Sequence, residues 1–324
     1  MNLNELRQIL HDFQDTPANR NELCEELVAT NASDMVWGYA DRHIPDLQEW
    51  WNRQLEIQEK LALHNDVDSD YTFDMRRLSG AYMNGADLWY ADLYFCDLSG
   101  ADLGDADLTN ANLRHAYLSN AYLSNADLSF ANLESAIMND ADLSEANLQF
   151  SICTNLSAQR SDFRNVEFRT SEDLFENANF QEANFNGCDL SYLYLRKVVF
   201  RGANLIDADL SYSDLRNSEF INASARYANF HGADLRDATM TSADLSDVDF
   251  SSAYMNSVDL SGSDLSDSDF RTSVLIFADF DGSNLDNTNF TGAALHHAFY
   301  DNETVFPEDF DPESRGMVYD DESE

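Results

Sequence analysis

Residues 86–135 read ADLWY ADLYF CDLSG ADLGD ADLTN ANLRH AYLSN AYLSN ADLSF ANLES, a run of five-residue units. Each unit begins with a small residue, usually Ala, and continues with a polar residue, usually Asp or Asn, before a large apolar residue at the third position. That large residue recurs every five residues from Leu78 to Phe168 and, after a shift of two residues, from Phe175 to Tyr300. Self-similarity at a fixed period predicts a repeat architecture.

A period of five fits neither of the regular secondary structures. An amphipathic helix repeats its apolar residues about every 3.6 positions and a half-buried strand every 2. A solenoid accommodates the period if each unit forms one side of a coil and then turns a corner. We therefore expect the small residue and the large third residue to point inward, and the other three to point outward.

The pattern A(D/N)LXX resembles that of the pentapeptide-repeat family. The resemblance implies an all-β solenoid, a right-handed quadrilateral β-helix with four units in each coil. The repeats would then form about 11 coils, with neighbouring strands about 4.8 Å apart. Residues 20 apart in the sequence would stack on one another, so the surface can be interpreted as stripes along the rod.

The chain before the repeats follows a different pattern. Apolar residues at helical spacing, such as Leu3, Leu6 and Leu10, predict a small α-helical N-terminal domain over residues 1–66. Residues 67–77 are expected to form a linker or capping coil. The β-helix is predicted over 78–306 with a two-residue slip near 169–175, and residues 307–324 are expected to form an acidic tail.

The composition narrows the functional class. The chain has 60 acidic and 19 basic residues and a formal net charge of −41 at pH 7. Such a charge repels phosphate backbones, so direct binding of nucleic acid is not expected. No apolar run is long enough to span a membrane, no signal segment opens the chain, and we expect a cytoplasmic protein without a membrane partner.

The sequence offers no catalytic or cofactor-binding motif. Its seven His show no metal-ligand spacing, and there is no P-loop, GxSxG or GxGxxG pattern. The four cysteines, Cys24, Cys96, Cys153 and Cys188, match no metal or disulfide framework. We therefore expect a protein that is not an enzyme, with no cofactor, no metal and no catalytic residue.

Stacking by 20 residues places aromatic and basic residues in two stripes. One stripe has Tyr90, Asn110, Phe130, Phe150, Thr170, Tyr192 and Tyr212 at the last position of the unit, and the other has Arg196, Arg216 and Arg236. Aromatic residues and Arg are enriched in protein interfaces. The predicted partner-binding residues are Tyr192, Tyr212, Arg196, Arg216, Arg236, Phe130 and Phe150. The alternative is that Asp214 and Asp234 neutralise the arginines and make the stripe structural.

A second aromatic cluster lies at the start of the repeats. It consists of Trp89, Tyr90, Tyr94 and Phe95. We expect these residues to dock the helical domain onto the first coils.

Two functions follow from these expectations. The first is a non-enzymatic protein-interaction scaffold, a rigid acidic rod that presents flat faces to a protein partner of unknown identity. The second comes from the resemblance: the quinolone-resistance branch of that family binds DNA gyrase, which implies a DNA mimic that modulates or protects a topoisomerase. Against the second, the end of this chain, DPESRGMVYDDESE, is too acidic and short for the hydrophobic dimerisation element of that branch.

Overall fold

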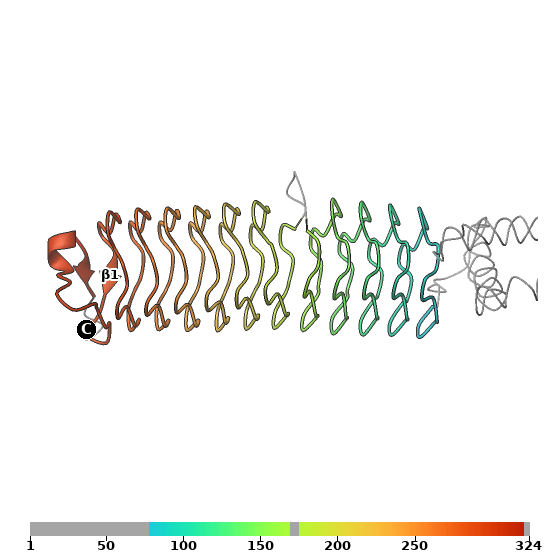
Figure 1. Ribbon diagram of the computed structural model, residues 1–324, viewed down its shortest axis with the longest axis horizontal. Coiled ribbons are helices and arrows are strands. Elements are labelled where there is room, and N and C mark those ends of the chain that lie inside the picture. Colours follow the sequence, from blue (N-terminus) through green and yellow to red (C-terminus); the bar gives the residue numbers. More distant parts are fainter. Residues whose placement is uncertain (1–77, 169–174, 321–324) are drawn as a thin grey trace, which may run out of the picture.

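The computed structural model describes residues 78–168 and 175–320. These residues form a rod of stacked coils, shown with its long axis horizontal in Figure 1. The α-helical domain and linker predicted before residue 78 lie outside the described residues, as does the predicted slip between residues 168 and 175.

Parallel bridges join residues one coil apart. Asp87 bridges Asp107, and Asp107 bridges Asp127, in steps of 20 residues. The step is 22 residues where the two blocks meet, as between Ser157 and Asn179. Because each 20-residue step contains four five-residue units, each followed by a turn, the coil has four sides. The predicted 20-residue stacking is confirmed, and the right-handed sense of the coil stays a prediction.

Backbone hydrogen bonds hold each coil to the next. The Leu88 N–H donates to the Asp107 carbonyl (2.8 Å), and the Asp107 N–H donates to the Ala86 carbonyl (2.9 Å). A corner interrupts the pairing after every unit, so most sides contribute a single bridge residue rather than a long strand. The named strands, β1 (Phe299–Tyr300) and β2 (Val318–Tyr319), are two residues each and pair in parallel.

The interior is filled by the first and third residues of the units. Ala106, Leu108 and Ala111 are at most 1% exposed, as the sequence predicted for inward positions. In the second block the third residue is often Phe. Phe230, Phe250 and Phe270 form a stack with centroids 5.2 and 5.0 Å apart. Phe220 from the opposite wall meets the edge of Phe230 at 5.8 Å, so the rings touch across the lumen as predicted.

The corner explains the residue preferences of the other positions. Residues at the last position of the unit have φ near +60°, for example Asn110 (59°) and Asn217 (59°). This left-handed conformation favours Gly, Asn and Asp. At the second position an Asp or Asn carboxylate or amide oxygen accepts a hydrogen bond from the backbone N–H two residues on. Asp107 Oδ1 accepts from the Thr109 N–H at 2.9 Å, and such local turns are typical of Asp and Asn.

The last coil is covered by the residues that follow the repeats. Phe310 packs against Phe290, with ring centroids 5.2 Å apart. The 3-10 helix η1 (Glu313–Arg315) follows, and Arg315 donates to the Phe290 carbonyl at 2.8 Å. Strand β2 then pairs with β1. The segment therefore closes one end of the hydrophobic lumen (Figure 1).

Candidate protein-interaction face

One side of the rod contains the predicted Arg stripe, and we call it the Arg face. It is the side whose bridge residues are Asp92, Asn112, Asn132 and Ile152 in the first block, and Tyr194, Asp214, Asp234, Tyr254, Val274 and Ala294 in the second. The fourth positions of the same units, two residues after these bridge residues, include Arg114, Arg196, Arg216 and Arg236. The structure thus brings the three arginines of the prediction onto one flat side.

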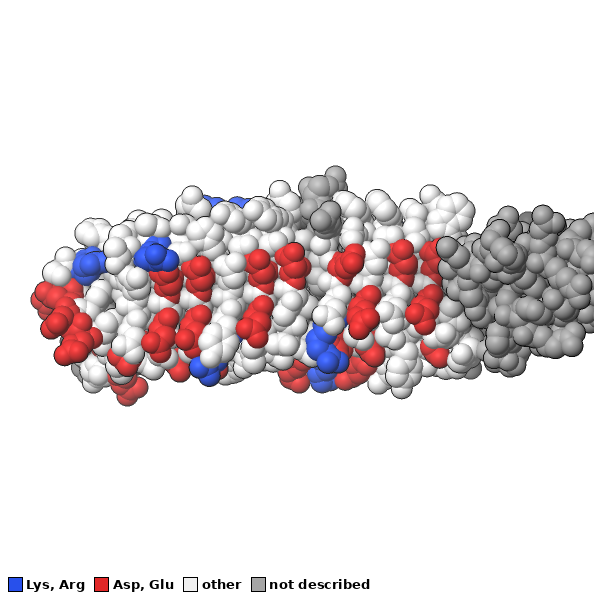
Figure 2. Space-filling view, viewed as in Figure 1, with Lys and Arg blue, Asp and Glu red and all other residues white. Residues whose placement is uncertain are grey.

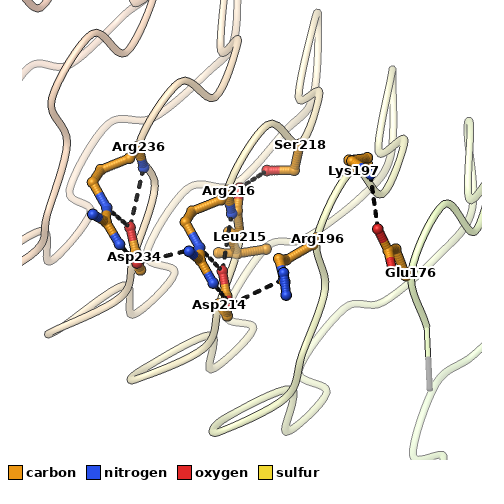
Figure 3. Close-up of polar contacts among 9 residues, drawn as sticks. All are labelled: Glu176, Arg196, Lys197, Asp214, Leu215, Arg216, Ser218, Asp234 and Arg236. Atoms are coloured by element: carbon orange, nitrogen blue, oxygen red, sulfur yellow. Dashed lines mark hydrogen bonds and ion pairs between the residues drawn. The ribbon is translucent and has the colours of Figure 1, made fainter. Parts of the chain in front are cut away.

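The arginines alternate with carboxylates along the Arg face (Figure 3). Arg216 donates from Nε and Nη2 to the two oxygens of Asp214, at 2.7 and 2.5 Å. Arg236 holds Asp234 in the same way. Arg196 Nε lies 3.4 Å from Asp214, and Arg216 Nε lies 3.5 Å from Asp234. Asp214 and Asp234 therefore compensate the arginines, which is the structural alternative weighed for this stripe.

The pairing lowers the pKa of Asp214. Burial alone would raise the pKa of this carboxyl group, but hydrogen bonds from the side chain and backbone of Arg216 favour the charged form. The net direction is below the ordinary value of 3.8. A carboxyl group whose pKa is lower in the folded state stabilises the fold above its unfolded pKa, and this contribution is lost as the pH falls through the folded value.

Asp214→Asn is expected to lower the free energy of unfolding at neutral pH by about 1–3 kcal/mol, because the ion pairs with Arg216 and Arg196 are lost. The difference from the parent protein should shrink as the pH falls below about 4. Urea unfolding at pH 7, 5 and 3 measures it. Asp189→Asn is the control, since Asn keeps the side-chain oxygen that accepts from the Ser191 backbone N–H. A pH-independent difference would contradict the role of the charge.

The predicted aromatic stripe forms one edge of the Arg face, and we call it the aromatic edge. Tyr192 and Tyr212 stack with centroids 5.1 Å apart, and they are 65% and 50% exposed. Phe130 and Phe150 stack at 5.1 Å in the first block. Thr170, placed between these two pairs by the sequence, lies outside the described residues.

The backbone does not explain why aromatic residues occupy this edge. Tyr192 and Tyr212 have φ of 59° and 57°, in the left-handed region. That conformation costs a residue other than Gly roughly 1–2 kcal/mol, and the exposed rings recover little of it by burial. The carbon that a side chain would add at Gly232 lies 2.8 Å from the Tyr212 ring, so Gly at the next coil makes room for it. The rings therefore lie exposed at positions whose backbone conformation disfavours them.

The aromatic residues proposed for docking lie at the beginning of the described rod. Trp89 and Tyr90 meet edge to face at 4.3 Å, and both are more than half exposed. Phe95 stacks on His115 at 4.8 Å. Docking of residues 1–66 onto this cluster remains a proposal, because that segment lies outside the described residues.

The structure adds exposed aromatic residues that the sequence interpretation did not assign to a site. Tyr194 and Tyr254 are bridge residues of the Arg face and are 39% and 54% exposed. Phe277, on the opposite edge, is 52% exposed and stacks on His297. A signal for the two tyrosines was present in the sequence. They share a 20-residue spacing with Asp214 and Asp234, and this spacing could have placed Tyr194 and Tyr254 beside the arginines.

The carboxylates cluster outside the Arg face. Figure 2 shows acidic side chains in rows along the rod. On the side that precedes the Arg face, Asp87, Asp107 and Asp127 are consecutive bridge residues, and so are Asp249 and Asp269. Near the covered end, burial and the charge of Asp259 raise the pKa of Asp279. The residues that the structure describes include no group of three His, Cys, Asp or Glu arranged to hold a metal ion.

Two cysteines of the interior are poor nucleophiles. Burial raises the pKa of Cys153 to about 12 and that of Cys188 to about 11. A thiol reacts as the thiolate, so both are expected to be inert near neutral pH. No helix among the described residues has the length and apolar character needed to cross a membrane.

The repeated corners, the packed lumen and the 20-residue ladders define a four-sided β-solenoid. The family pattern described as pentapeptide repeats matches this chain in eight copies, over 77–105, 101–140, 141–169, 174–202, 203–241, 234–271 and 268–299. The chain belongs to the pentapeptide-repeat family.

Several solved structures are similar to this chain. HetL, a pentapeptide-repeat protein involved in heterocyst differentiation regulation in the cyanobacterium Nostoc, is 25% identical over 75% of this chain and 92% of its own, with a TM-score of 0.31. A thylakoid-lumen pentapeptide-repeat protein of Arabidopsis thaliana is 28% identical over 37% of this chain and 72% of its own, with a TM-score of 0.26. QnrB1, a plasmid-mediated fluoroquinolone resistance protein, is 16% identical over 74% of this chain and 89% of its own, with a TM-score of 0.27. No curated protein matches the sequence.

Proposed function

We propose that the protein is a non-enzymatic protein-interaction scaffold that binds a protein partner through the Arg face and its aromatic edge. The observation that supports this function most is the exposed Tyr192–Tyr212 stack in the left-handed backbone conformation. Aromatic rings and Arg provide most of the binding energy in many protein interfaces. A flat, hydrogen-bonded side also keeps them in fixed positions, so little side-chain freedom would be lost on binding.

Arg216 and Arg236 can contact a protein partner while each keeps its ion pair with an aspartate. Each is fixed by a bidentate contact with an aspartate and remains partly exposed, at 35% and 45% of the side chain. Such fixed guanidinium groups can still stack on or donate to a partner. Reversal of the charge at Arg216 and Arg236 would bring four carboxylates together, counting Asp214 and Asp234, so the tyrosines are the cleaner positions to change.

Replacing Tyr192 and Tyr212 by Asn is expected to abolish partner recovery without loss of stability. Asn is favoured in the left-handed conformation and already occupies the same corner at Asn110. The measurement is quantitative affinity purification from the native host, with thermal unfolding in parallel. Tyr227→Asn is the matched control, since Tyr227 has φ of 62° and 51% exposure on another corner. Equal recovery of the same proteins by the parent and the double variant would refute the proposed site.

The acidic rows support a second candidate, a DNA mimic that binds gyrase or another topoisomerase. Successive carboxylates at bridge positions, such as Asp249 and Asp269, give a regularly spaced line of negative charge. Supercoiling by purified gyrase, with and without the protein, tests this candidate. The paired substitutions Asp189→Asn and Asp209→Asn should weaken an effect that depends on the row, while the tyrosine variant should leave it unchanged.

A further inference from the structure

The Arg face is the least charged side of the rod. We compare the described residues at the second and fourth positions of the units, which point outward on each side. The Arg face has five acids and four bases. The preceding side has eight acids and one base, and the other two have six acids with one base and six acids with two bases. In a chain of net charge −41, this near-neutrality is a local exception.

Ion pairs account for most of the charge that the face does have. Glu134 contacts Arg114 at 3.0 Å, and Glu176 contacts Lys197 of the neighbouring corner at 2.8 Å. The two aspartates of the ladder are held by Arg216 and Arg236. The face and its two edges also contain nine of the sixteen exposed large apolar side chains of the described residues. Low net charge with exposed aromatic rings is typical of an interface core.

We infer that the Arg face binds the Arg face of a second copy of this chain. The inference rests on the proposed function, in which this face binds protein, and it names the occupant. A basic partner would be drawn to the acidic sides, whereas an acidic partner is repelled least where the local charge is near zero. A second copy is such an acidic partner, and its face has the same flat shape and the same coil spacing.

The area of the Arg face fits a stable dimer. About 11 coils at about 4.8 Å give a length of about 50 Å, and five extended residues span about 16 Å. A face of these dimensions offers about 800 Å² per copy, the size of a standard specific interface. In a dimer with two-fold symmetry the same surface patch of each copy lies in the interface. The Tyr192–Tyr212 stack of each copy would then be covered by the other copy.

Salt dependence distinguishes this dimer from one held by charge attraction. Two copies of a strongly acidic rod repel each other, and dissolved salt screens that repulsion. The dimer is therefore expected to become tighter by at least about tenfold in Kd when NaCl is raised from about 0.05 M to about 0.5 M. Sedimentation equilibrium of the full chain over a range of protein concentrations measures this change.

Substitution of the tyrosines tests whether the dimer contact lies at the Arg face and its aromatic edge. The double variant Tyr192→Asn, Tyr212→Asn is expected to raise the dimer Kd at least about tenfold, which corresponds to about 1.4 kcal/mol. Tyr227→Asn, at an equivalent exposed corner, should leave Kd unchanged. Far-ultraviolet circular dichroism of each variant checks that the fold is retained, and Tyr212→Phe, which keeps the ring, should leave the dimer Kd unchanged.

Cross-linking identifies the occupant of the face. Lys197 and Lys60 are the two lysines of the chain, and Lys197 lies at the corner after Arg196, about halfway along the described residues. An amine cross-linker on mixed isotope-labelled and unlabelled chains should join Lys197 of one copy to Lys197 of another. A link from Lys60 to Lys197 within one chain would assign the face to residues 1–66 and overturn the inference.

Three other results would also overturn it: a monomer at every concentration and salt, a dimer that salt weakens, or a dimer that the tyrosine variant leaves intact. The test of the dimer is independent of the test of the proposed scaffold function. A monomeric chain that still recovers host proteins through Tyr192 and Tyr212 would retain the proposed function and lose only the dimer. A chain that forms the dimer but recovers no host protein would retain the dimer and lose the proposed function.

Discussion

Leu108→Asp is expected to lower the free energy of unfolding by about 3–5 kcal/mol, the range of strongly disruptive core substitutions. Leu108 is fully buried among the inward residues of neighbouring coils. A carboxylate at this position would be removed from water, and the buried side chains of the described coils include no cation to pair with it. Urea unfolding followed by circular dichroism measures the loss. In a stacked-repeat protein the damaged coils can also unfold separately, which would broaden the transition.

Asp107, the residue before Leu108, provides the contrast. It points outward, and Asp107→Asn should be nearly neutral because Asn keeps the oxygen that accepts from the Thr109 N–H. Asp107→Ala removes that acceptor and should cost about 1 kcal/mol. Equal stability of Leu108→Asp and Asp107→Asn would refute the inward and outward assignment.

Phe250→Ala is the second substitution with a large expected effect, about 3–5 kcal/mol. The Phe250 ring is fully buried between Phe230 and Phe270, at 5.2 and 5.0 Å. Its removal leaves a cavity that the coils cannot fill, because their backbone hydrogen bonds fix the spacing of the walls. Thermal unfolding and urea titration measure the loss.

Phe277→Ala serves as the control for this effect. Phe277 also stacks on a ring, that of His297, but it is 52% exposed at a corner. Its removal is expected to change the free energy of unfolding by no more than about 0.5 kcal/mol. A loss as large as that of Phe250→Ala would show that stacking of rings, rather than burial, dominates the stability of the rod.

The fold could be predicted because its signal is repeated. One period-five unit says little, but its recurrence from Leu78 to Tyr300 leaves few architectures that bury the third residue each time. The resemblance to the pentapeptide-repeat family then fixed the number of sides, and the bridges confirm the 20-residue step. The slip between the blocks was visible in the sequence, while its conformation lies outside the described residues.

The candidate site was predictable only in part. The 20-residue step placed Tyr192 beside Tyr212 and Arg196 beside Arg216, since neighbours along a ladder follow from register alone. The identity of the Arg partners did not follow. Asp214 is a candidate neutralising residue by its place in the sequence, and only side-chain geometry shows that it pairs with both Arg216 and, at a longer distance, Arg196.

The residues that lie inside follow from the sequence alone, because the alternation of small and large apolar residues is a local pattern that each coil repeats. The net charge of −41 also follows from the sequence alone. Tertiary structure decided how that charge is distributed around the rod. The four sides share one unit pattern, so the pattern alone does not mark the Arg face, where acids and bases nearly balance. That balance arises from contacts between coils, such as Arg114 with Glu134 at 3.0 Å, and these exist only once residues 20 apart are stacked.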